Sequence, residues 1–301
     1  MVEVNWMTAA LLISPSEFVT YFLNGLSRGM ILFLIASGLT LIFGLIGLIN
    51  FAHGAMVALG GYATYMTVST IGNFWLGIVA GALFVAVAGF LLEKTILHRL
   101  YEEPLLGFLG TFGIGLVIEQ VLSYYFGDQS YSISSPFPGA TDLLGIAYPT
   151  HRLFVILIGA LVALVIGGLL SRTRLGLEIH ATANEPSTAE ILGVDSRRVY
   201  TITFVLGSVL AAVAGGLTAP ITSIYPGIGT SYMLEAFLVI IVGGMGSFKG
   251  SFLVSLIVGQ ITAFGWLVLE PTYVQMAIFV AAMAFILYKP RGFFGKPEVF
   301  E

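Results

Sequence analysis

Long apolar runs follow one another along the whole chain of 301 residues. Each is close to the ~20 residues that a helix needs to cross a bilayer, and the runs are continuously apolar, which favours helices over the alternating strands of a membrane barrel. They occupy residues 18–46, 51–70, 74–97, 105–126, 152–170, 199–222, 233–248, 252–269 and 272–288. We therefore predict an all-α fold, a polytopic helical membrane protein with eight or nine transmembrane segments in a single domain over 1–301.

Two of these segments do not have the length of a simple crossing. The first, 18–46, is too long for one straight span and carries several glycines, among them Gly25 and Gly38, so we expect it to be kinked or broken. The seventh, 233–248, is short for a full crossing. A re-entrant segment is the alternative there, and for this reason the predicted number of crossings is eight or nine.

Charged residues make up only 9% of the chain, against about a quarter in soluble domains. Their positions are informative because the cytoplasmic loops of membrane proteins are enriched in lysine and arginine. With nine crossings, one side of the membrane receives Lys94, Arg99, Arg172, Arg174, Arg197, Arg198, Lys249, Lys289, Arg291 and Lys296. Only Arg28 and Arg152 lie elsewhere. This distribution predicts an N-terminus outside, a cytoplasmic C-terminus and an outer position for the loop 127–150.

Several classes of chemistry are excluded or disfavoured by the residues present. The chain has no cysteine and its four histidines are scattered, so neither a thiol site nor a clustered metal site is expected. Its basic residues form no stripe that would bind nucleic acid. The glycine-rich run GGMGSFKGS (243–251) lacks the Gly-Lys-Ser/Thr order of a phosphate-binding loop. We expect no catalytic residue, no bound metal and no ATP bound by this chain.

Residues 171–198, SRTRLGLEIHATANEPSTAEILGVDSRR, form the longest predicted cytoplasmic loop and are far more polar than their surroundings. Within them, 184–193 is predicted to be a short helix with Asn184 as its N-cap. Glu185 would lie near the positive end of the helix dipole, and Gly193 would end the helix. Two isolated helical turns are not stable in water. The helix therefore needs a surface to pack on, either the protein's own inner face or a cytoplasmic partner.

The same loop contains the pattern A-x-A-N-x-x-x-x-A-x-x-L-G-V, starting at Ala181, which resembles the cytoplasmic loop of ABC-importer permeases. Other stretches resemble the branched-chain amino acid permease family: GLTLIFGLIGLINFAHGAMVALGGY (38–62), TFVLGSVLAAVAGGLTAP (203–220), AFLVIIVGGMGSFKGSFLVSLIVG (236–259) and KPRGFFGKPE (289–298). Their order and the total length agree with that family, and the similarity covers residues 18–298. Because no long extension is present, the chain most resembles the H-type subunit, the shorter of the family's two permeases.

This resemblance implies the permease subunit of an ATP-driven importer in a prokaryotic plasma (inner) membrane. The implied partners are a second related permease, two cytoplasmic ATP-binding subunits that use ATP and Mg, an extracytoplasmic solute-binding protein and membrane lipid. The cargo would be leucine, isoleucine or valine, and urea, an amide or another small solute is the alternative within the family. The ATPase-coupling loop would use Ala183, Asn184, Glu185, Ala189, Leu192 and Gly193.

Candidates for the solute path are polar and glycine positions in or beside the apolar segments: Asn50, His53, Gly54, Glu119, Gly243 and Gly244. Polar groups at membrane depth are costly unless they are paired or face water. For Asn50 we favour a helix cap over the path, and for His53 the path and an inner-end position are equally supported. Glu119 would need a basic partner, and Arg28 is the only basic residue within another span. We therefore expect a Glu119–Arg28 pair that holds the bundle together.

Three positions differ from the pattern that this family often shows. Glu178 and His180 stand where the family often has basic residues, and both would face the cytoplasmic partner. Glu235 stands where the family often has a lysine. It would lie near the outer boundary of the membrane, where a solute-binding protein docks.

Two further alternatives stay open. A stand-alone channel or a secondary transporter would give the cytoplasmic helix no role, and secondary transporters usually show internal repeats. An intramembrane serine protease using Ser27 and His53 is the enzymatic alternative, because GLSRG (25–29) matches the nucleophile-elbow pattern. That pattern belongs to a strand–turn–helix, whereas here it falls in an apolar helix.

Overall fold

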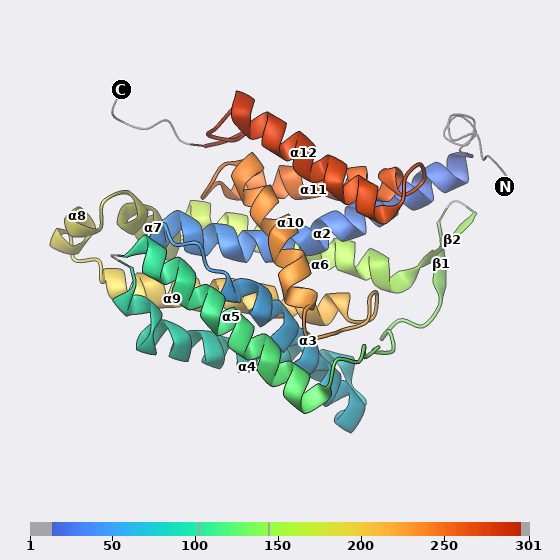
Figure 1. The fold of residues 1–301 in the computed structure, drawn as a ribbon, viewed down its shortest axis with the longest axis horizontal. Helices are drawn as coiled ribbons and strands as arrows, with labels where there is room; N and C mark the ends of the chain where they lie inside the picture. Colours follow the sequence, from blue (N-terminus) through green and yellow to red (C-terminus); the bar gives the residue numbers. More distant parts are fainter. Residues whose placement is uncertain (1–13, 102, 144, 296–301) are drawn as a thin grey trace.

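A computed structural model describes residues 14–101, 103–143 and 145–295 of the chain. Nine helices in these ranges build one bundle: α2 (Pro15–Ile46), α3 (Ala52–Ile71), α4 (Phe74–Thr95), α5 (Pro104–Phe126), α6 (Thr150–Arg172), α9 (Ser196–Thr218), α10 (Ile228–Gly243), α11 (Phe248–Gly265) and α12 (Pro271–Tyr288). Most of them run lengthwise, whereas α10 crosses its neighbours at a steep angle (Figure 1). Each predicted apolar segment corresponds to one of these helices, so the all-α prediction is confirmed.

Shorter elements lie at the two ends of the bundle. The 3-10 helix η1 (Leu97–Arg99) follows α4, and the helices α7 (Arg174–Asn184) and α8 (Pro186–Ile191) connect α6 to α9 at one end. The strands β1 (Ala140–Leu143) and β2 (Ile146–Pro149) form an antiparallel hairpin at the opposite end (Figure 1). We call these two ends the α7–α8 end and the hairpin end.

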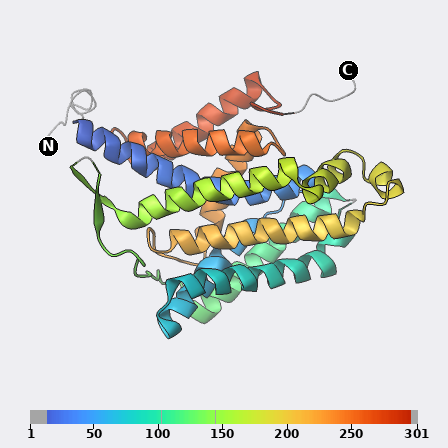
Figure 2. The same ribbon diagram turned by 180° about the vertical axis from the view of Figure 1, so that it is seen from behind.

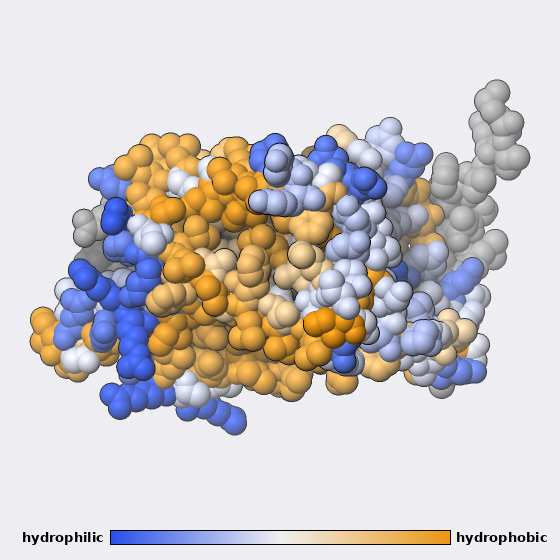
Figure 3. All heavy atoms as spheres, turned by 90° about the horizontal axis from the view of Figure 1, so that it is seen from below, coloured by the Kyte–Doolittle hydropathy of each residue, from blue (hydrophilic) through white to orange (hydrophobic). Residues whose placement is uncertain are grey.

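The outer surface of the bundle is apolar over most of its length. Figure 3 shows a broad hydrophobic band between two more polar ends. Within the band, Leu83 of α4 is 63% exposed, Leu164 of α6 is 75% exposed and Val280 of α12 is 61% exposed. Seven of the described helices are long and apolar enough to cross a membrane. Because soluble monomers rarely expose so large an apolar surface, this band is the surface that contacts lipid.

The helix α2 is the centre of the bundle. It runs unbroken for 32 residues, and every residue from Gly29 to Ile42 is buried. It packs closely on α11, since a Cβ atom added to Gly259 would lie only 2.4 Å from the carbonyl oxygen of Gly25. The break expected in the first apolar segment is therefore wrong. Glycines in this helix let a neighbouring backbone approach and leave the helix continuous.

The helices α3 and α9 also meet at glycines. A Cβ atom on Gly60 would lie 2.3 Å from the Cα of Ala212, and one on Gly215 would lie 2.0 Å from the carbonyl oxygen of Val57. The view from behind shows α9 lying between α6 and α4 (Figure 2). This tight crossing fixes the position of α3, which carries two of the predicted path residues, His53 and Gly54.

Candidate functional site

Residues 171–198 contain two helices, α7 and α8, rather than the single short helix predicted over 184–193. The helix that the prediction missed, α7, packs its apolar side on the bundle, where Ile179 is buried beside Leu45 of α2 and Val199 of α9. Apolar residues spaced four apart along α7 are the sequence signal that could have revealed it. The loop is thus anchored to the membrane helices and is not a free connection.

The boundary between these two helices corrects the predicted cap. Asn184 is the last residue of α7, and its side-chain N–H donates a hydrogen bond to the carbonyl of His180 at 2.9 Å. A residue with helical backbone cannot serve as the N-cap of the next helix, because that position requires an extended conformation. Glu185 takes the N-cap position instead, and its carboxylate accepts a hydrogen bond from the Ser187 hydroxyl at 2.7 Å.

The helix α8 has one buried side and one exposed side. Ala189 is only 2% exposed, whereas Ile191 is 86% exposed and Leu192 is 78% exposed. Gly193 follows with a φ of 88° and ends the helix as predicted. Ala183 packs with the cluster under α7. Ile191 and Leu192 are thus two large apolar side chains exposed at a polar end of the bundle, and we call them the apolar tip.

Two of the predicted path residues, Gly54 and Glu119, line one cavity of about 160 Å³ between α3, α5 and α10. The carboxylate of Glu119 accepts a hydrogen bond from the Thr230 hydroxyl at 3.0 Å. Apolar groups make up most of the remaining lining: Phe51, Ala55, Ala58, Phe112, Leu116, Leu122, Met233 and Leu234. We call this space the α3–α5–α10 cavity.

Asn50 and His53 are fully buried and do not line this cavity. The Nε2 atom of His53 lies 3.0 Å from the carbonyl oxygen of Ile35 on α2. The cap expected from Asn50 is wrong, because the backbone N–H of Phe51 donates to the Thr111 hydroxyl of α5 at 3.1 Å and no side chain of the preceding residues caps α3. Within the described residues, neither amide atom of Asn50 has a hydrogen-bond partner.

Gly243 and Gly244 lie away from the cavity, at the bend between α10 and α11. A Cβ atom on Gly243 would lie 2.6 Å from the carbonyl carbon of Gly250, and Gly244 has a φ of 101°. The carbonyl of Gly243 accepts a hydrogen bond from the backbone N–H of Phe294 at 3.0 Å. These glycines allow the segment after α12 to pack on the bend, so the structure does not bring them together with Gly54 and Glu119.

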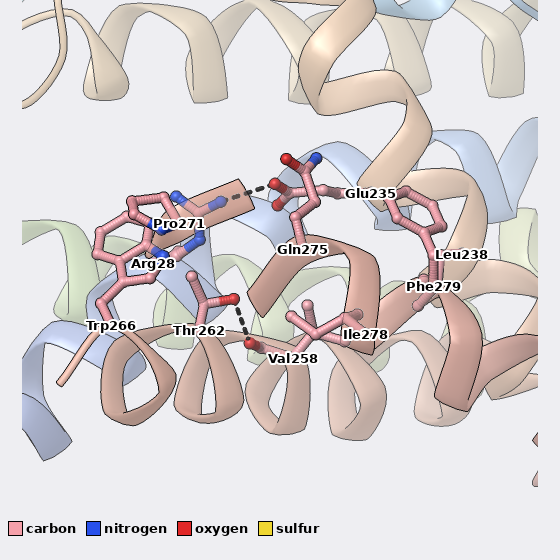
Figure 4. Close-up of a pocket in the computed structure, with 10 residues that line it drawn as sticks. All are labelled: Arg28, Glu235, Leu238, Val258, Thr262, Trp266, Pro271, Gln275, Ile278 and Phe279. Atoms are coloured by element: carbon pink, nitrogen blue, oxygen red, sulfur yellow. Dashed lines mark hydrogen bonds and ion pairs between the residues drawn. The ribbon is translucent and has the colours of Figure 1, made fainter. Parts of the chain in front are cut away.

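Arg28 pairs with Glu235 and not with Glu119, so the predicted Glu119–Arg28 pair is wrong. The guanidinium of Arg28 on α2 donates to the carboxylate of Glu235 on α10 at 2.7 Å, and lies 5.2 Å from the centre of the Trp266 ring. Figure 4 shows Gln275 of α12 beside the same carboxylate. Because α10 packs against α2, Glu235 is held inside the bundle, and its side chain is 15% exposed. It does not form the outer docking surface that the sequence suggested.

This ion pair leads to a prediction for stability. The Arg28→Leu variant leaves Glu235 as an uncompensated charge, and we expect it to lose about 3 kcal/mol of stability, the lower end for a buried pair because Arg28 stays 26% exposed. The double variant Arg28→Leu/Glu235→Leu should recover most of that loss, since no charge is left unpaired. Heat unfolding followed by tryptophan fluorescence measures the stability of the single variant and of the double variant. If the double variant lost as much stability as the two single variants together, the result would contradict a stabilising role confined to the pair.

Comparison with known proteins identifies the family of this chain. Residues 21–287 match the family model described as branched-chain amino acid transport system, permease component. Among curated relatives, the high-affinity branched-chain amino acid transport system permease protein LivH of Escherichia coli K12 is 29% identical over 94% of this chain and 99% of its own length. The protein of the same description in Pseudomonas aeruginosa, BraD, is 28% identical over 94% of this chain and 97% of its own length.

A sugar permease is also similar, over a smaller part of the chain. The D-allose transport system permease protein AlsC of Escherichia coli K12 is 28% identical over 79% of this chain and 72% of its own length. The family model, by contrast, extends from α2 to the end of α12. The chain therefore belongs to the family of permease components of branched-chain amino acid transport systems.

Proposed function

We propose that the chain is a membrane-spanning subunit of an ATP-driven importer and that its cargo is a branched-chain amino acid: leucine, isoleucine or valine. The observation that carries this proposal is the family match over residues 21–287. Relatives named for high-affinity branched-chain amino acid transport cover nearly the whole chain, whereas the sugar permease covers less of it. A second related permease, two ATP-binding subunits that use ATP and Mg, and an extracytoplasmic solute-binding protein would complete the assembly.

The distribution of basic residues supports an orientation with the α7–α8 end in the cytoplasm of a prokaryotic cell. Basic residues lie in and after the last turn of α4, in and around α7 and α8, and after α10 and α12: Lys94, Arg99, Arg172, Arg174, Arg197, Arg198, Lys249, Lys289 and Arg291. The loop at the hairpin end carries Asp128 and Asp142 and no basic residue before Arg152. Because loops rich in lysine and arginine stay in the cytoplasm, the N-terminus lies on the outer side of the inner membrane and the C-terminus lies on its cytoplasmic side.

The loop at the α7–α8 end supports a coupling role. The apolar tip gives an ATP-binding subunit two exposed side chains to hold, Ile191 and Leu192. The neighbouring α7 is anchored to α2 and α9 through Ile179. A movement of the docked subunit would thereby pass to the centre of the bundle.

The alternatives explain fewer of these features. A stand-alone channel or a secondary transporter gives the apolar tip no role. A serine protease would need His53 near Ser27. The ring of His53 instead forms a hydrogen bond with the carbonyl oxygen of Ile35, which lies about 12 Å along α2 from Ser27. Urea or an amide as cargo is judged by the experiment that follows.

Uptake of radiolabelled leucine into proteoliposomes carrying the whole assembly tests this proposal. We expect uptake that requires ATP, the ATP-binding subunits and the solute-binding protein. Uptake that persists without ATP or without those subunits would contradict the importer and favour a channel or secondary transporter. ATP hydrolysis stimulated by another solute, with no leucine uptake, would keep the assembly and replace the cargo.

A further inference from the structure

The α3–α5–α10 cavity has one polar end and one apolar end. Glu119 and Thr230 meet toward the hairpin end, because Glu119 lies in the last third of α5, the part that leads to the hairpin. Phe112 lies nearer the start of α5, and its ring centre is 5.9 Å from that of Phe51. The cavity is therefore shaped for a molecule with a charged head and an apolar tail.

The polar end carries a negative charge without a cationic partner. In the part of the chain that the structure describes, the ion pairs join Arg28 to Glu235 and Arg174 to Glu178, and none involves Glu119. The Thr230 hydroxyl uses only part of the capacity of a carboxylate, which has about four acceptor positions. A carboxylate among apolar groups at membrane depth is costly unless its charge is compensated. The remaining acceptor positions suit a cationic donor such as an ammonium group.

The size of the cavity suits an aliphatic side chain. Its volume is about 160 Å³, and an apolar protein cavity of about 150 Å³ is known to hold benzene, which has six carbons. The side chains of leucine and isoleucine have four carbons and that of valine has three. Ala55 and Ala58 are small lining residues, and larger side chains at these positions would take up part of this space.

We propose that the α3–α5–α10 cavity binds the cargo amino acid during its passage, with Glu119 and Thr230 holding the α-ammonium group and the aliphatic side chain directed toward Phe51 and Phe112. This inference rests on the proposed function and adds the group that selects the cargo. A neutral solute such as urea or an amide gives the Glu119 carboxylate no compensating charge. A charge-assisted hydrogen bond to ammonium is the stronger interaction, so Glu119 favours amino acids over neutral solutes.

Photolabelling of the complete importer tests this site. The probe is a leucine analogue with a diazirine in its side chain, delivered by the solute-binding protein and activated by light during ATP turnover. We expect label on residues that line the cavity, such as Phe112 and Leu116, and loss of the label when excess leucine competes. In Glu119→Gln, labelling and leucine uptake should fall about 10-fold or more, because a hydrogen bond to a charged group is lost. In Glu119→Asp, both should lie between the values of the wild type and of Glu119→Gln.

The matched control is Glu270→Gln, which makes the same change at an exposed glutamate before α12, outside the cavity. It should label and transport like the wild type. ATP hydrolysis stimulated by the loaded solute-binding protein should be retained in Glu119→Gln, which separates loss of cargo binding from loss of assembly. Label confined to other residues, or unchanged labelling in Glu119→Gln, would overturn this inference alone. A wild-type assembly that hydrolyses ATP but takes up no amino acid would overturn the proposed cargo, and the ammonium site with it.

Discussion

Replacing Ile191 and Leu192 with aspartate will reduce ATP-driven uptake by at least about 100-fold while the permease stays folded. Both side chains are exposed in the permease alone, at 86% and 78%, so charges there are solvated until a partner docks. On docking, each aspartate would be buried without a partner and would cost about 2 kcal/mol or more. Since 1.4 kcal/mol is a factor of ten in binding, two such charges are enough to release an ATP-binding subunit.

Uptake in proteoliposomes and co-purification of the ATP-binding subunits measure this effect together. The matched control is Ser187→Asp with Thr188→Asp, which adds the same charge at exposed polar positions of α8 and should cost far less. Charges placed at Ala189 would be harder to interpret, because Ala189 is 2% exposed and a larger side chain there would disturb the loop itself. Normal uptake in the Ile191/Leu192 variant would show that the apolar tip is not the docking surface.

The Gly215→Ile variant will fail to form a stable bundle. A Cβ atom at this position would lie 2.0 Å from the carbonyl oxygen of Val57 and 3.0 Å from the backbone nitrogen of Gly61. Backbone atoms of α3 cannot move aside as a flexible side chain can, so the two helices must separate. Overpacking of a core costs about 1–3 kcal/mol and more where backbone must shift, and here it would open the α3–α9 crossing.

The yield of monodisperse protein after detergent extraction, followed by size-exclusion chromatography, measures this loss. The matched control is Gly168→Ile in α6, because a Cβ atom on Gly168 meets nothing within 4 Å. The two variants make the same change within a helix and differ in the space available. We expect wild-type yield for Gly168→Ile and little folded protein for Gly215→Ile. Equal behaviour of the two would mean that helix propensity, and not the close crossing, sets the outcome.

For most of the helices, the ends predicted from the sequence lie within a few residues of the observed ends. The ninth apolar segment, 272–288, corresponds to α12 at Pro271–Tyr288, and the third, 74–97, to α4 at Phe74–Thr95. Such agreement is expected because a span in lipid must satisfy its backbone hydrogen bonds internally and must be apolar along its length. The errors are larger at α10, which was predicted over 233–248 and lies at Ile228–Gly243.

The candidate site was predicted less well than the helices. Asn184 and Asn50 were assigned caps by their local sequence, but α7 extends through Asn184 and the Thr111 hydroxyl of α5 takes the N–H at the start of α3. Glu119 was paired with Arg28, which bonds to Glu235 instead. The outcomes for Asn50 and Glu119 depend on residues distant in sequence, to which local patterns do not respond. The error at Asn184 came from missing the apolar spacing of α7, which is a local signal.

The sequence by itself determined the all-α class, the order and approximate ends of the membrane helices, the concentration of basic residues on one side, and the polar loop that contains α8. These properties follow from the local need of each segment for lipid or water. The tertiary structure alone decided which helix faces meet, which acid pairs with Arg28, and that Gly54 and Glu119 share a cavity with Thr230. A helix that is apolar all round does not show which side is inward, because lipid and protein core are equally apolar. The choice is made by close backbone contacts such as that of Gly215 with Val57, between residues far apart in the chain.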